Sequence, residues 1–401
     1  MELNEIKKLL NPSRSKIVLL VMDGLGGLPR EAGGPTELEA AQTPHLDRLA
    51  LDGVCGLHQV IGTGITPGSG PAHLALFGYD PFRYFIGRGV LEGMGIGFDL
   101  GPDDVAARGN YATIDTDGKI TDRRAGRIST EKNIELTHRL RQIKIPGVEI
   151  FIEPIKEYRV LLVLRGEGLS GEISGTDPQG VNVEVARAEA LAPEASETAR
   201  LVNEFTEQAR AALAGQEPAN MVFFRGFSMK PYLPQMGDVF GLNAAAIAQY
   251  PMYKGLSRLV GMDILEAGQR TQELFDTLET YWEDYDFFYV HVKRIDSAGE
   301  DGDFERKTAL IEEADSFIPR VMALNPDVVV VTGDHSTPAY LKSHSWHPVP
   351  VLLWSKYCRP DGVQRFGEKD CLSGGLGPRL PAVDLLPLAL ANAGRLNKYG
   401  A

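Results

Sequence analysis

The chain has 401 residues, of which 43% are apolar and 24% are charged, as in soluble globular proteins. This length predicts two domains, or one domain that carries a large insertion. The formal net charge of -13 argues against nucleic acid as a partner, because phosphate backbones are bound by basic surfaces. A small anionic substrate remains compatible with that charge, since a local cluster of arginines can override the global field.

The apolar segments indicate neither a membrane span nor an export signal. No run of about 18 apolar residues occurs, and residues 1–10 predict a short charged helix without the apolar centre of a signal peptide. The three cysteines, Cys55, Cys358 and Cys371, lack the spacing of metal ligands. Their odd number fits a reducing compartment, so we expect a cytoplasmic protein without membrane partners.

The first predicted strand, Ile17–Met22, is continuously apolar, which is typical of a strand covered on both faces. It ends at Asp23-Gly24. An acidic residue at the carboxyl end of such a strand faces the crevice in which α/β sheets bind ligands. An ordinary Asp-Gly turn is the alternative. A dinucleotide-binding loop is excluded, because Pro29 stands where the third glycine should fall.

Two helix starts follow this strand. Thr43-Pro44 places a capping residue before a proline at the first helical position. The glycine-rich segment 61–73 then turns into a second helix, with Ser69 at or near its N-terminus, where backbone N–H groups favour an anion. No lysine precedes the serine, so this is not a Walker loop. Ser69 is either a helix cap or a nucleophile, and a nucleophilic hydroxyl would need a metal ion for its activation.

The middle of the chain differs from both ends. From Asp103 to about Gly226 it is rich in arginine, and a long helix is predicted at residues 193–214, with its proline in the first turn. We expect an inserted α+β domain here. The predicted core comprises residues 1–102 and 229–401, and residues 103–228 form the predicted substrate-binding cap.

Further apolar runs predict strands along the rest of the chain: Arg159–Leu164, Met221–Phe224, Phe287–Val292, Asp327–Thr332 and Val349–Trp354. Helical segments alternate with them, such as Glu305–Ile318, for which Pro319 is the expected end or kink. This alternation predicts an α/β fold with a mostly parallel sheet flanked by helices.

Acidic residues and histidines adjoin the last three runs: Asp296 and Glu300, Asp334 and His335, and His344 and His347. The spacing of four in the first pair puts both carboxylates on one face of a helical turn. Taken alone, each pair could belong to a surface, a turn or a structural hydrogen bond. Together with Asp23 they suit two divalent ions in mixed nitrogen and oxygen sites, such as Mn²⁺ or Zn²⁺. Two metal ions side by side can clamp an in-line displacement.

These residues resemble the alkaline phosphatase superfamily, and within it the cofactor-independent phosphoglycerate mutases of the compact archaeal type, which also occur in bacteria. The matching segments follow the family's order and span most of the chain: Val21–Gly24, Thr43–Asp47, Pro67–His73, Asp122–Arg127, Lys254-Gly255 and Thr332–Thr337. The resemblance implies an alkaline-phosphatase-like core with an inserted cap. It also implies a 2,3-bisphosphoglycerate-independent isomerase of glycolysis and gluconeogenesis.

The resemblance further implies two metal sites. One ion would be bound by Asp23, Ser69, Asp334 and His335, and the other by Asp296, Glu300 and His344. His344 matches the family's position counted back from Pro348, and His347 is the second candidate. Glu300 departs from the family pattern, which has a histidine there. A glutamate hardens the site, so Mn, Mg, Co and Zn all remain open, with Mn or Zn favoured.

The substrate-binding residues and the reaction are likewise implied by the resemblance. Six side chains would bind the anionic phosphoglycerate: Arg108, Asn110, Arg123, Arg127, Arg225 and Lys254. Ser69 would accept the phosphoryl group and return it to the other hydroxyl of glycerate, with Asp122 as general acid and base. The rival hypotheses are a metal-dependent phosphatase or phosphonate hydrolase with the same site, and a non-catalytic metal-binding protein on the same fold.

Overall fold

The computed structural model describes residues 2–84 and 86–400. Met1 of the predicted N-terminal helix lies outside this range, and helix α1 is Leu3–Leu9. The chain divides into two compact units. Unit 1 combines residues 1–85 with 233–401, and unit 2 contains residues 86–232. Unit 2 starts earlier than the expected cap because helix α5 (Arg88–Gly95) contacts its strands.

Unit 1 is built around an eight-stranded sheet with the order β13-β2-β12-β11-β1-β10-β8-β9. Its strands are β1 (Ile17–Met22), β2 (Val54–Gln59), β8 (Ala244–Ile247), β9 (Asp263–Ile264), β10 (Phe287–Val292), β11 (Val328–Thr332), β12 (Val349–Ser355) and β13 (Gly377–Pro381). All neighbouring pairs are parallel except the two that β12 forms with β11 and β2. The prediction of a mostly parallel α/β sheet is confirmed.

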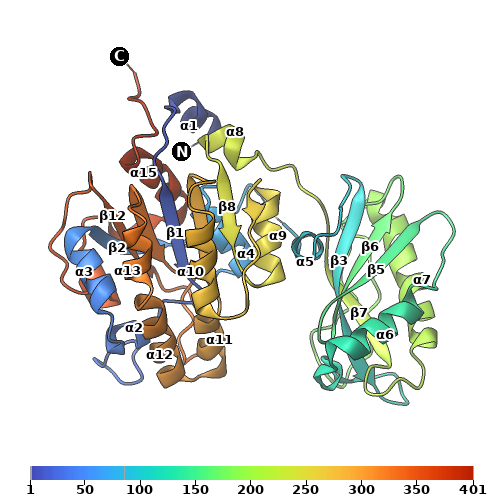
Figure 1. The fold of residues 1–401 in the computed structure, drawn as a ribbon. Coiled ribbons are helices and arrows are strands. Elements are labelled where there is room, and N and C mark those ends of the chain that lie inside the picture. Colours follow the sequence, from blue (N-terminus) through green and yellow to red (C-terminus); the bar gives the residue numbers. More distant parts are fainter. Residues whose placement is uncertain (1, 85, 401) are drawn as a thin grey trace. The chain divides into compact units, whose positions relative to one another are not determined.

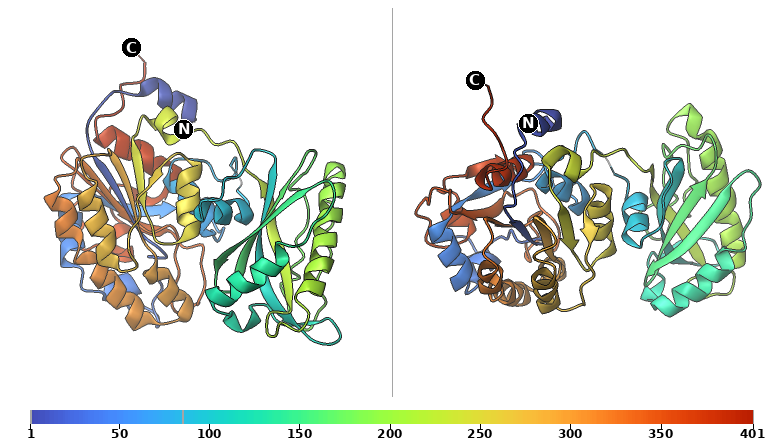
Figure 2. Two further views of the ribbon diagram at one scale, coloured as in Figure 1. Left: turned by 45° about the vertical axis from the view of Figure 1, so that its right-hand side comes forward. Right: turned by 45° about the horizontal axis from the view of Figure 1, so that its top comes forward.

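Helices cover both faces of this sheet (Figure 1 and Figure 2). Val18, Leu20 and Met22 of β1 point into a core shared with α3, α10, α12 and α13. The alternate residues Ile17 and Leu19 face side chains of α4 and α15. The remaining bounds in unit 1 are α2 (Glu37–Ala40), α3 (Pro44–Asp52), α4 (Ser69–Leu76), α8 (Met236–Phe240), α9 (Pro251–Leu259), α10 (Thr271–Thr280), α11 (Arg294–Asp301), α12 (Phe304–Asp315), α13 (Ile318–Ala323), α14 (Glu368–Cys371), the 3₁₀ turn η3 (Ala382–Asp384) and α15 (Leu385–Asn392).

The structure confirms both predicted helix starts in the first part of the chain. Thr43 is the N-cap residue of α3, with Pro44 in its first turn, as predicted. Helix α4 begins at Ser69, also as predicted. The helix expected over Glu305–Ile318 is confirmed up to Asp315, where α12 ends three residues early. The break expected near Pro319 lies just before it: α13 begins at Ile318 and holds Pro319 in its first turn, where a backbone nitrogen needs no intrahelical partner.

Unit 2 contains an antiparallel five-stranded sheet. Its elements are α5, β3 (Asp104–Ile114), β4 (Ile120–Asp122), η1 (Ala125–Arg127), α6 (Thr130–Leu140), β5 (Glu149–Lys156), β6 (Arg159–Arg165), η2 (Pro193–Ala195), α7 (Ser196–Ala212) and β7 (Met221–Met229). Helices α6 and α7 pack on one face of the sheet, and α5 contacts β3 and β7. The runs Arg159–Leu164 and Met221–Phe224 thus belong to antiparallel strands of this unit, not to the parallel sheet. Their sequences are continuously apolar because α6 and α7 cover one face of their sheet and form a core with it.

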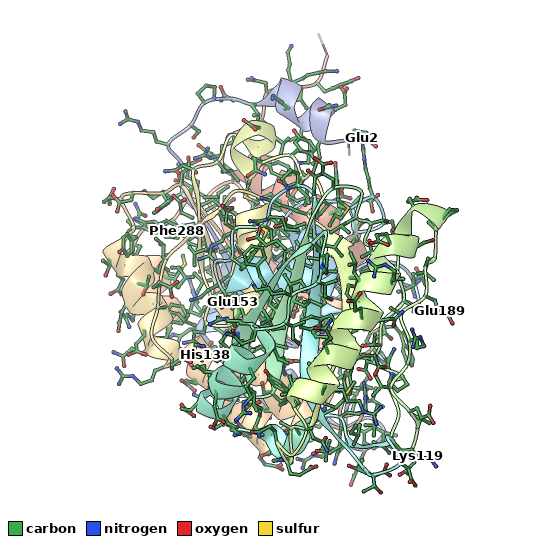
Figure 3. All side chains as sticks on the ribbon, turned by 90° about the vertical axis from the view of Figure 1, so that its right-hand side faces the viewer. Glu2, Lys119, His138, Glu153, Glu189 and Phe288 are labelled. Atoms are coloured by element: carbon green, nitrogen blue, oxygen red, sulfur yellow. The ribbon has the colours of Figure 1, made fainter. Side chains whose placement is uncertain are left out.

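Side chains that end in nitrogen or oxygen project from the side of unit 2 seen in Figure 3. Lys119 and Glu189 are exposed, whereas Glu153 on β5 is partly covered by an ion pair with Arg141 at 2.5 Å. Such mixed charge keeps a surface soluble without adding much stability. Among the helices that the structure describes, none has the length and apolar character needed to cross a membrane.

Candidate metal and nucleophile site

Three neighbouring parallel strands bring the predicted ligands of unit 1 to one edge of the sheet. Strand β1 lies between β10 and β11 and runs parallel to both, so their carboxyl ends meet. Asp23 follows β1, Asp296 lies on α11 directly after β10, and Asp334 follows β11. Asp23 N–H donates to the Val292 carbonyl at 3.1 Å, and this hydrogen bond joins the segment after β1 to the end of β10.

A first cluster of metal-ligand type consists of Asp23, Asp334 and His335, all fully buried. One ligand atom of each lies within 4.8 Å of the others. His335 Nε2 is 3.2 Å from Asp334 Oδ2 and 3.5 Å from Asp23 Oδ1. Neither of these carboxylate oxygens has a hydrogen-bond donor among the described residues. The other Asp334 oxygen accepts the N–H of Gly24 at 3.0 Å.

The hydrogen bonds of His335 determine which ring nitrogen carries its proton. Thr337 has one hydroxyl hydrogen and donates it to Asp296 Oδ1 at 2.7 Å. The contact of 2.9 Å between Thr337 Oγ1 and His335 Nδ1 therefore requires Nδ1–H as donor. Burial lowers the pKa of His335 well below its usual value, so the ring is neutral. His335 Nε2 thus presents a lone pair to two carboxylates, an arrangement that a cation among them would stabilise.

A second cluster comprises Asp296, His335 and His344. His344 Nδ1 lies 2.9 Å from the Pro67 carbonyl, which can only accept, so Nε2 again carries the lone pair. That nitrogen is 3.6 Å from Asp296 Oδ1 and 4.0 Å from Glu300 Oε1. Glu300 is the more exposed carboxylate of the two, although it lies on the same helix as Asp296. Both clusters therefore contain the N and O ligands that fit divalent metals.

His347, the second candidate for the histidine ligand, belongs to neither cluster among the described residues. Its Nδ1 lies 3.0 Å from Ser345 Oγ, and its ring stacks on Trp346. The structure brings His344 to the site and gives His347 local partners.

Ser69 lies at the start of α4, and the N-cap residue of that helix is Gly68. Its hydroxyl is 3.2 Å from His335 Nε2. The Ser69 hydroxyl is therefore directed at the first cluster and does not serve as the helix cap. The helix N-terminus adds partial positive charge at the same place.

The charges in the first cluster are strongly unbalanced. Burial would raise the pKa of Asp23, but Lys293 and His291 hold it well below its usual value. Burial raises the pKa of Asp334 well above its usual value, and the neighbouring Asp23 and Asp296 raise it further. Lys293 Nζ contacts Asp296 and lies 3.1 Å from Asp23 Oδ2. One ammonium group thus faces carboxylates that a divalent cation would neutralise more fully.

Several residues of this site were missed by sequence reasoning. Tyr253 donates its hydroxyl to Asp23 Oδ2 at 2.5 Å, and His291 Nε2 lies 3.1 Å from the same oxygen. Both are fully buried. Lys293 directly follows the predicted strand Phe287–Val292, and Tyr253 adjoins the matched segment Lys254-Gly255, so only proximity to a motif could have indicated them.

The predicted substrate residues of unit 2 gather partly on β3 and β7. Arg108 lies opposite Arg225 across these strands, and Arg108 Nη2 donates to Asn110 Oδ1 at 3.4 Å. Arg123 binds both oxygens of buried Asp177, at 3.2 and 2.7 Å. Burial and then the nearby guanidinium of Arg88 lower the pKa of Arg108, to about 10. A buried, electropositive cluster of this kind suits an anionic ligand.

Three other predicted residues have different surroundings. The carboxylate of Asp122 accepts the N–H groups of Arg124 and Gly126 at 2.8 and 2.6 Å, so it closes a turn. Arg127 is exposed at a φ of 55°, and its backbone N–H donates to the Arg124 carbonyl at 2.8 Å. Lys254 belongs to unit 1 and pairs with Glu266 at 2.5 Å.

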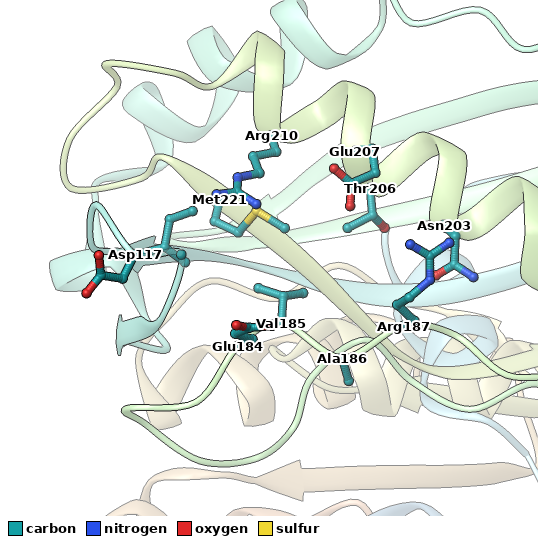
Figure 4. Close-up of a pocket in the computed structure, with 12 residues that line it drawn as sticks. Asp117, Glu184, Val185, Ala186, Arg187, Asn203, Thr206, Glu207, Arg210 and Met221 are labelled. Carbon is teal, nitrogen blue, oxygen red and sulfur yellow. The ribbon is translucent and has the colours of Figure 1, made fainter.

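A cavity of about 280 Å³ in unit 2 contains none of the predicted site residues. It lies between α7 and the segment 184–187, where Asn203, Arg210 and Arg187 line it (Figure 4). The presence of a cavity therefore does not by itself identify the predicted substrate or metal site in this protein.

Comparison with known proteins identifies the family. The family model for 2,3-bisphosphoglycerate-independent phosphoglycerate mutase matches residues 50–220. A protein of Thermus thermophilus, named probable 2,3-bisphosphoglycerate-independent phosphoglycerate mutase, is 50% identical over 99% of this chain and 98% of its own. The chain belongs to this family. A phosphoglycerate mutase relative from Aquifex aeolicus, bearing the same name, is 49% identical over 99% of both chains.

Two solved structures share the fold of this phosphoglycerate mutase family member. The PH0037 protein of Pyrococcus horikoshii has a TM-score of 0.84 at 30% identity, covering 96% of this chain and 99% of that one. The cofactor-independent phosphoglycerate mutase of Thermoplasma acidophilum has a TM-score of 0.71 at 29% identity, covering 95% and 100%. The family resemblance based on the sequence motifs is thereby confirmed.

Proposed function

We propose that this chain interconverts 3-phosphoglycerate and 2-phosphoglycerate without 2,3-bisphosphoglycerate, through a phosphoserine at Ser69. Its relatives are named for this isomerase activity, a step of glycolysis and gluconeogenesis. The observation that carries the proposal is the position of the Ser69 hydroxyl. It lies at a helix N-terminus, 3.2 Å from the lone pair of His335 and next to buried carboxylates that lack donors on their facing oxygens.

Two divalent cations complete the proposal. Asp23, Ser69, Asp334 and His335 would hold one, and Asp296, Glu300 and His344 the other. When bound, such a cation supplies Lewis-acid chemistry that favours the alkoxide form of a serine. The facing lone pairs and carboxylates of both clusters support this assignment. Their mixture of imidazole and carboxylate suits Mn or Zn, which we propose ahead of Mg and Co.

The chain's own residues account for the transfer. Ser69 Oγ forms a bond to phosphorus while the bond to the glycerate oxygen breaks, and the second hydroxyl of glycerate later reverses the exchange. The N-terminus of α4 stabilises negative charge at Ser69. Asp122 would exchange protons with the glycerate hydroxyls, and its two backbone hydrogen bonds fix its orientation. Six side chains would bind glycerate and its phosphate: Arg108, Asn110, Arg123, Arg127, Arg225 and Lys254.

We further propose that the reaction takes place in the cytoplasm on this small anionic substrate, without nucleic acid. The three cysteines, Cys55, Cys358 and Cys371, are free thiols, as expected where thiols are kept reduced. The net charge of -13 disfavours nucleic-acid binding.

An enolase-coupled assay with 3-phosphoglycerate and Mn²⁺, in the absence of 2,3-bisphosphoglycerate, tests this function. We expect turnover by the wild type and a loss of at least about 10³-fold in Ser69→Ala, since nucleophile removal abolishes the covalent route. Ser373→Ala, which removes an exposed hydroxyl that binds the Asp370 carbonyl, is the matched control. Full activity in Ser69→Ala would refute the serine mechanism. Stoichiometric release of free phosphate would instead favour the phosphatase alternative.

A further inference from the structure

The arginine cluster of unit 2 includes two residues that no motif indicated. Arg88 and Glu92 lie one turn apart on α5, and Glu92 is fully buried. Arg88 Nε is 3.5 Å from Glu92 Oε1, and Arg108 Nη1 is 3.8 Å from the same oxygen. Glu92 is therefore shared between a predicted substrate-binding arginine on β3 and a second arginine on a different element.

Two glycines allow the backbone of α5 at Arg88 to lie close against the sheet. A Cβ at Gly89 would come within 2.3 Å of the Ala106 backbone, so only glycine lets α5 lie directly on β3. Gly226 on β7, at a φ of 65°, leaves a space whose nearest atom is Arg88 Cβ, at 3.0 Å from an added Cβ. The stem of Arg88 is thus held against both strands that carry Arg108 and Arg225.

The charges of this cluster leave a positive excess. Asp177 is shared by Arg123 at 2.7 Å and Arg225 at 3.9 Å, as Glu92 is shared by Arg88 and Arg108. These four guanidiniums against two carboxylates leave at least two uncompensated positive charges, and Arg159 is a further charged neighbour of Arg108. Burial lowers the pKa of Arg225, and Arg88 is the neighbouring charge that lowers it most. An excess of two charges suits a carboxylate or phosphate ligand, which guanidinium groups bind through paired hydrogen bonds.

Glu92 lies beside the guanidiniums of Arg88 and Arg108 without accepting a hydrogen bond from them. Both of its oxygens are buried and accept no hydrogen bond from any described residue. Arg108 Nε and Arg225 Nε likewise have no described acceptor. A buried carboxylate without hydrogen bonds is a poor source of stability, because its desolvation is costly. Its position between two guanidiniums therefore indicates a role in holding them for a ligand.

We propose that Arg88 binds an anionic group of phosphoglycerate directly and that Glu92 is a positioning residue, which orients Arg88 and Arg108. This inference rests on the proposed mutase function. Arg88 adds a guanidinium to the six side chains named above, and Glu92 acts only through the arginines.

Arg88→Gln is the primary test, because Arg88 is 44% exposed and its replacement leaves the core of unit 2 intact. We expect KM for 3-phosphoglycerate to rise about tenfold or more, as one bidentate charged contact is lost. Free phosphate per 2-phosphoglycerate formed should also rise, because glycerate escapes more often and water then hydrolyses phosphoserine to serine and phosphate. Arg200→Gln, an exposed arginine of α7 paired with Glu197 and Glu204, is the control and should change neither value.

Glu92→Gln separates positioning from simple electrostatics. Removal of one negative charge from an anion site would by itself lower KM, whereas loss of positioning raises it. We expect a KM about tenfold higher, with partial recovery in Glu92→Asp, which keeps the charge on a shorter stem. A KM at or below the wild-type value in Glu92→Gln would overturn the positioning role.

Failure of the Arg88 role and failure of the mutase function give different results. An unchanged KM and phosphate ratio in Arg88→Gln, in a wild type that is an active mutase, would overturn the role of Arg88 alone. A wild-type protein without mutase activity would overturn the proposed function and this inference together. Melting curves of all variants, compared with Arg200→Gln, show whether a changed KM accompanies a folded unit 2.

Discussion

A buried ion pair connects the loops that follow β1 and β11, and its removal should be costly. Lys307 on α12 donates to the carbonyls of Gly26 and Thr337, each at 2.9 Å, and lies 3.9 Å from Glu37 Oε1. Both charged side chains are fully buried. The Lys307 ammonium thus compensates Glu37 and joins two segments that adjoin the predicted metal ligands.

Lys307→Met keeps most of the side-chain volume but leaves the Glu37 charge and two carbonyls without this donor. Glu37 would retain only backbone donors, from Leu28 at 3.2 Å and Ala339 at 2.6 Å. Removing one partner of a buried pair costs about 3–5 kcal/mol. The exposed pairs of Arg200 provide the comparison, since Arg200→Met should cost less than about 1 kcal/mol. Urea unfolding of wild type and both variants measures the difference.

The double variant Glu37→Gln/Lys307→Met checks the cause. If an uncompensated buried charge is responsible, this variant should be more stable than Lys307→Met, although it carries one further substitution. A loss in Lys307→Met no larger than that in Arg200→Met would refute the reasoning. So would a double variant that is less stable than the single one.

Two further predictions concern pH and metal choice. Burial raises the pKa of Glu368 to about 7, against 4.5 for an ordinary glutamate. The folded protein thus binds this proton more tightly than the unfolded chain, so its free energy of unfolding should fall as pH rises from about 4.5 to about 7. In Glu368→Gln, urea titrations should show a smaller fall, and an identical one would contradict the assignment. Glu300→His should shift metal preference towards Zn²⁺, measured by metal content after equilibration with mixed ions, and an unchanged preference would exclude a tuning role.

The core strands of unit 1 could be predicted because burial on both faces leaves a continuous apolar run. Ile17–Met22 and Phe287–Val292 coincide with β1 and β10. The same signal carries no information about strand direction. Arg159–Leu164 and Val349–Trp354 therefore looked alike in sequence, yet one belongs to the antiparallel sheet of unit 2 and the other is the reversed strand β12 of unit 1.

The placement of the candidate ligands was also accessible from the sequence. Asp23, Asp296 and Asp334 each follow an apolar run, and parallel strands bring their carboxyl ends to one edge. The family position counted from Pro348 favoured His344 over His347, whereas residue type and spacing did not separate the two. The structure separates them through the Pro67 carbonyl, which lies far away in sequence and binds only His344.

The sequence by itself determined the family, the α/β architecture and the residue types at the strand ends, because short-range patterns and motifs carry that information. Only the tertiary structure decided which other residues contact the site residues and the segments beside them. Glu92 meets Arg108, and Lys307 meets Glu37, through contacts between separate elements. The residues next to a glutamate or lysine in the sequence do not predict such a partner. Whether a charge is buried and paired depends on how the whole chain packs.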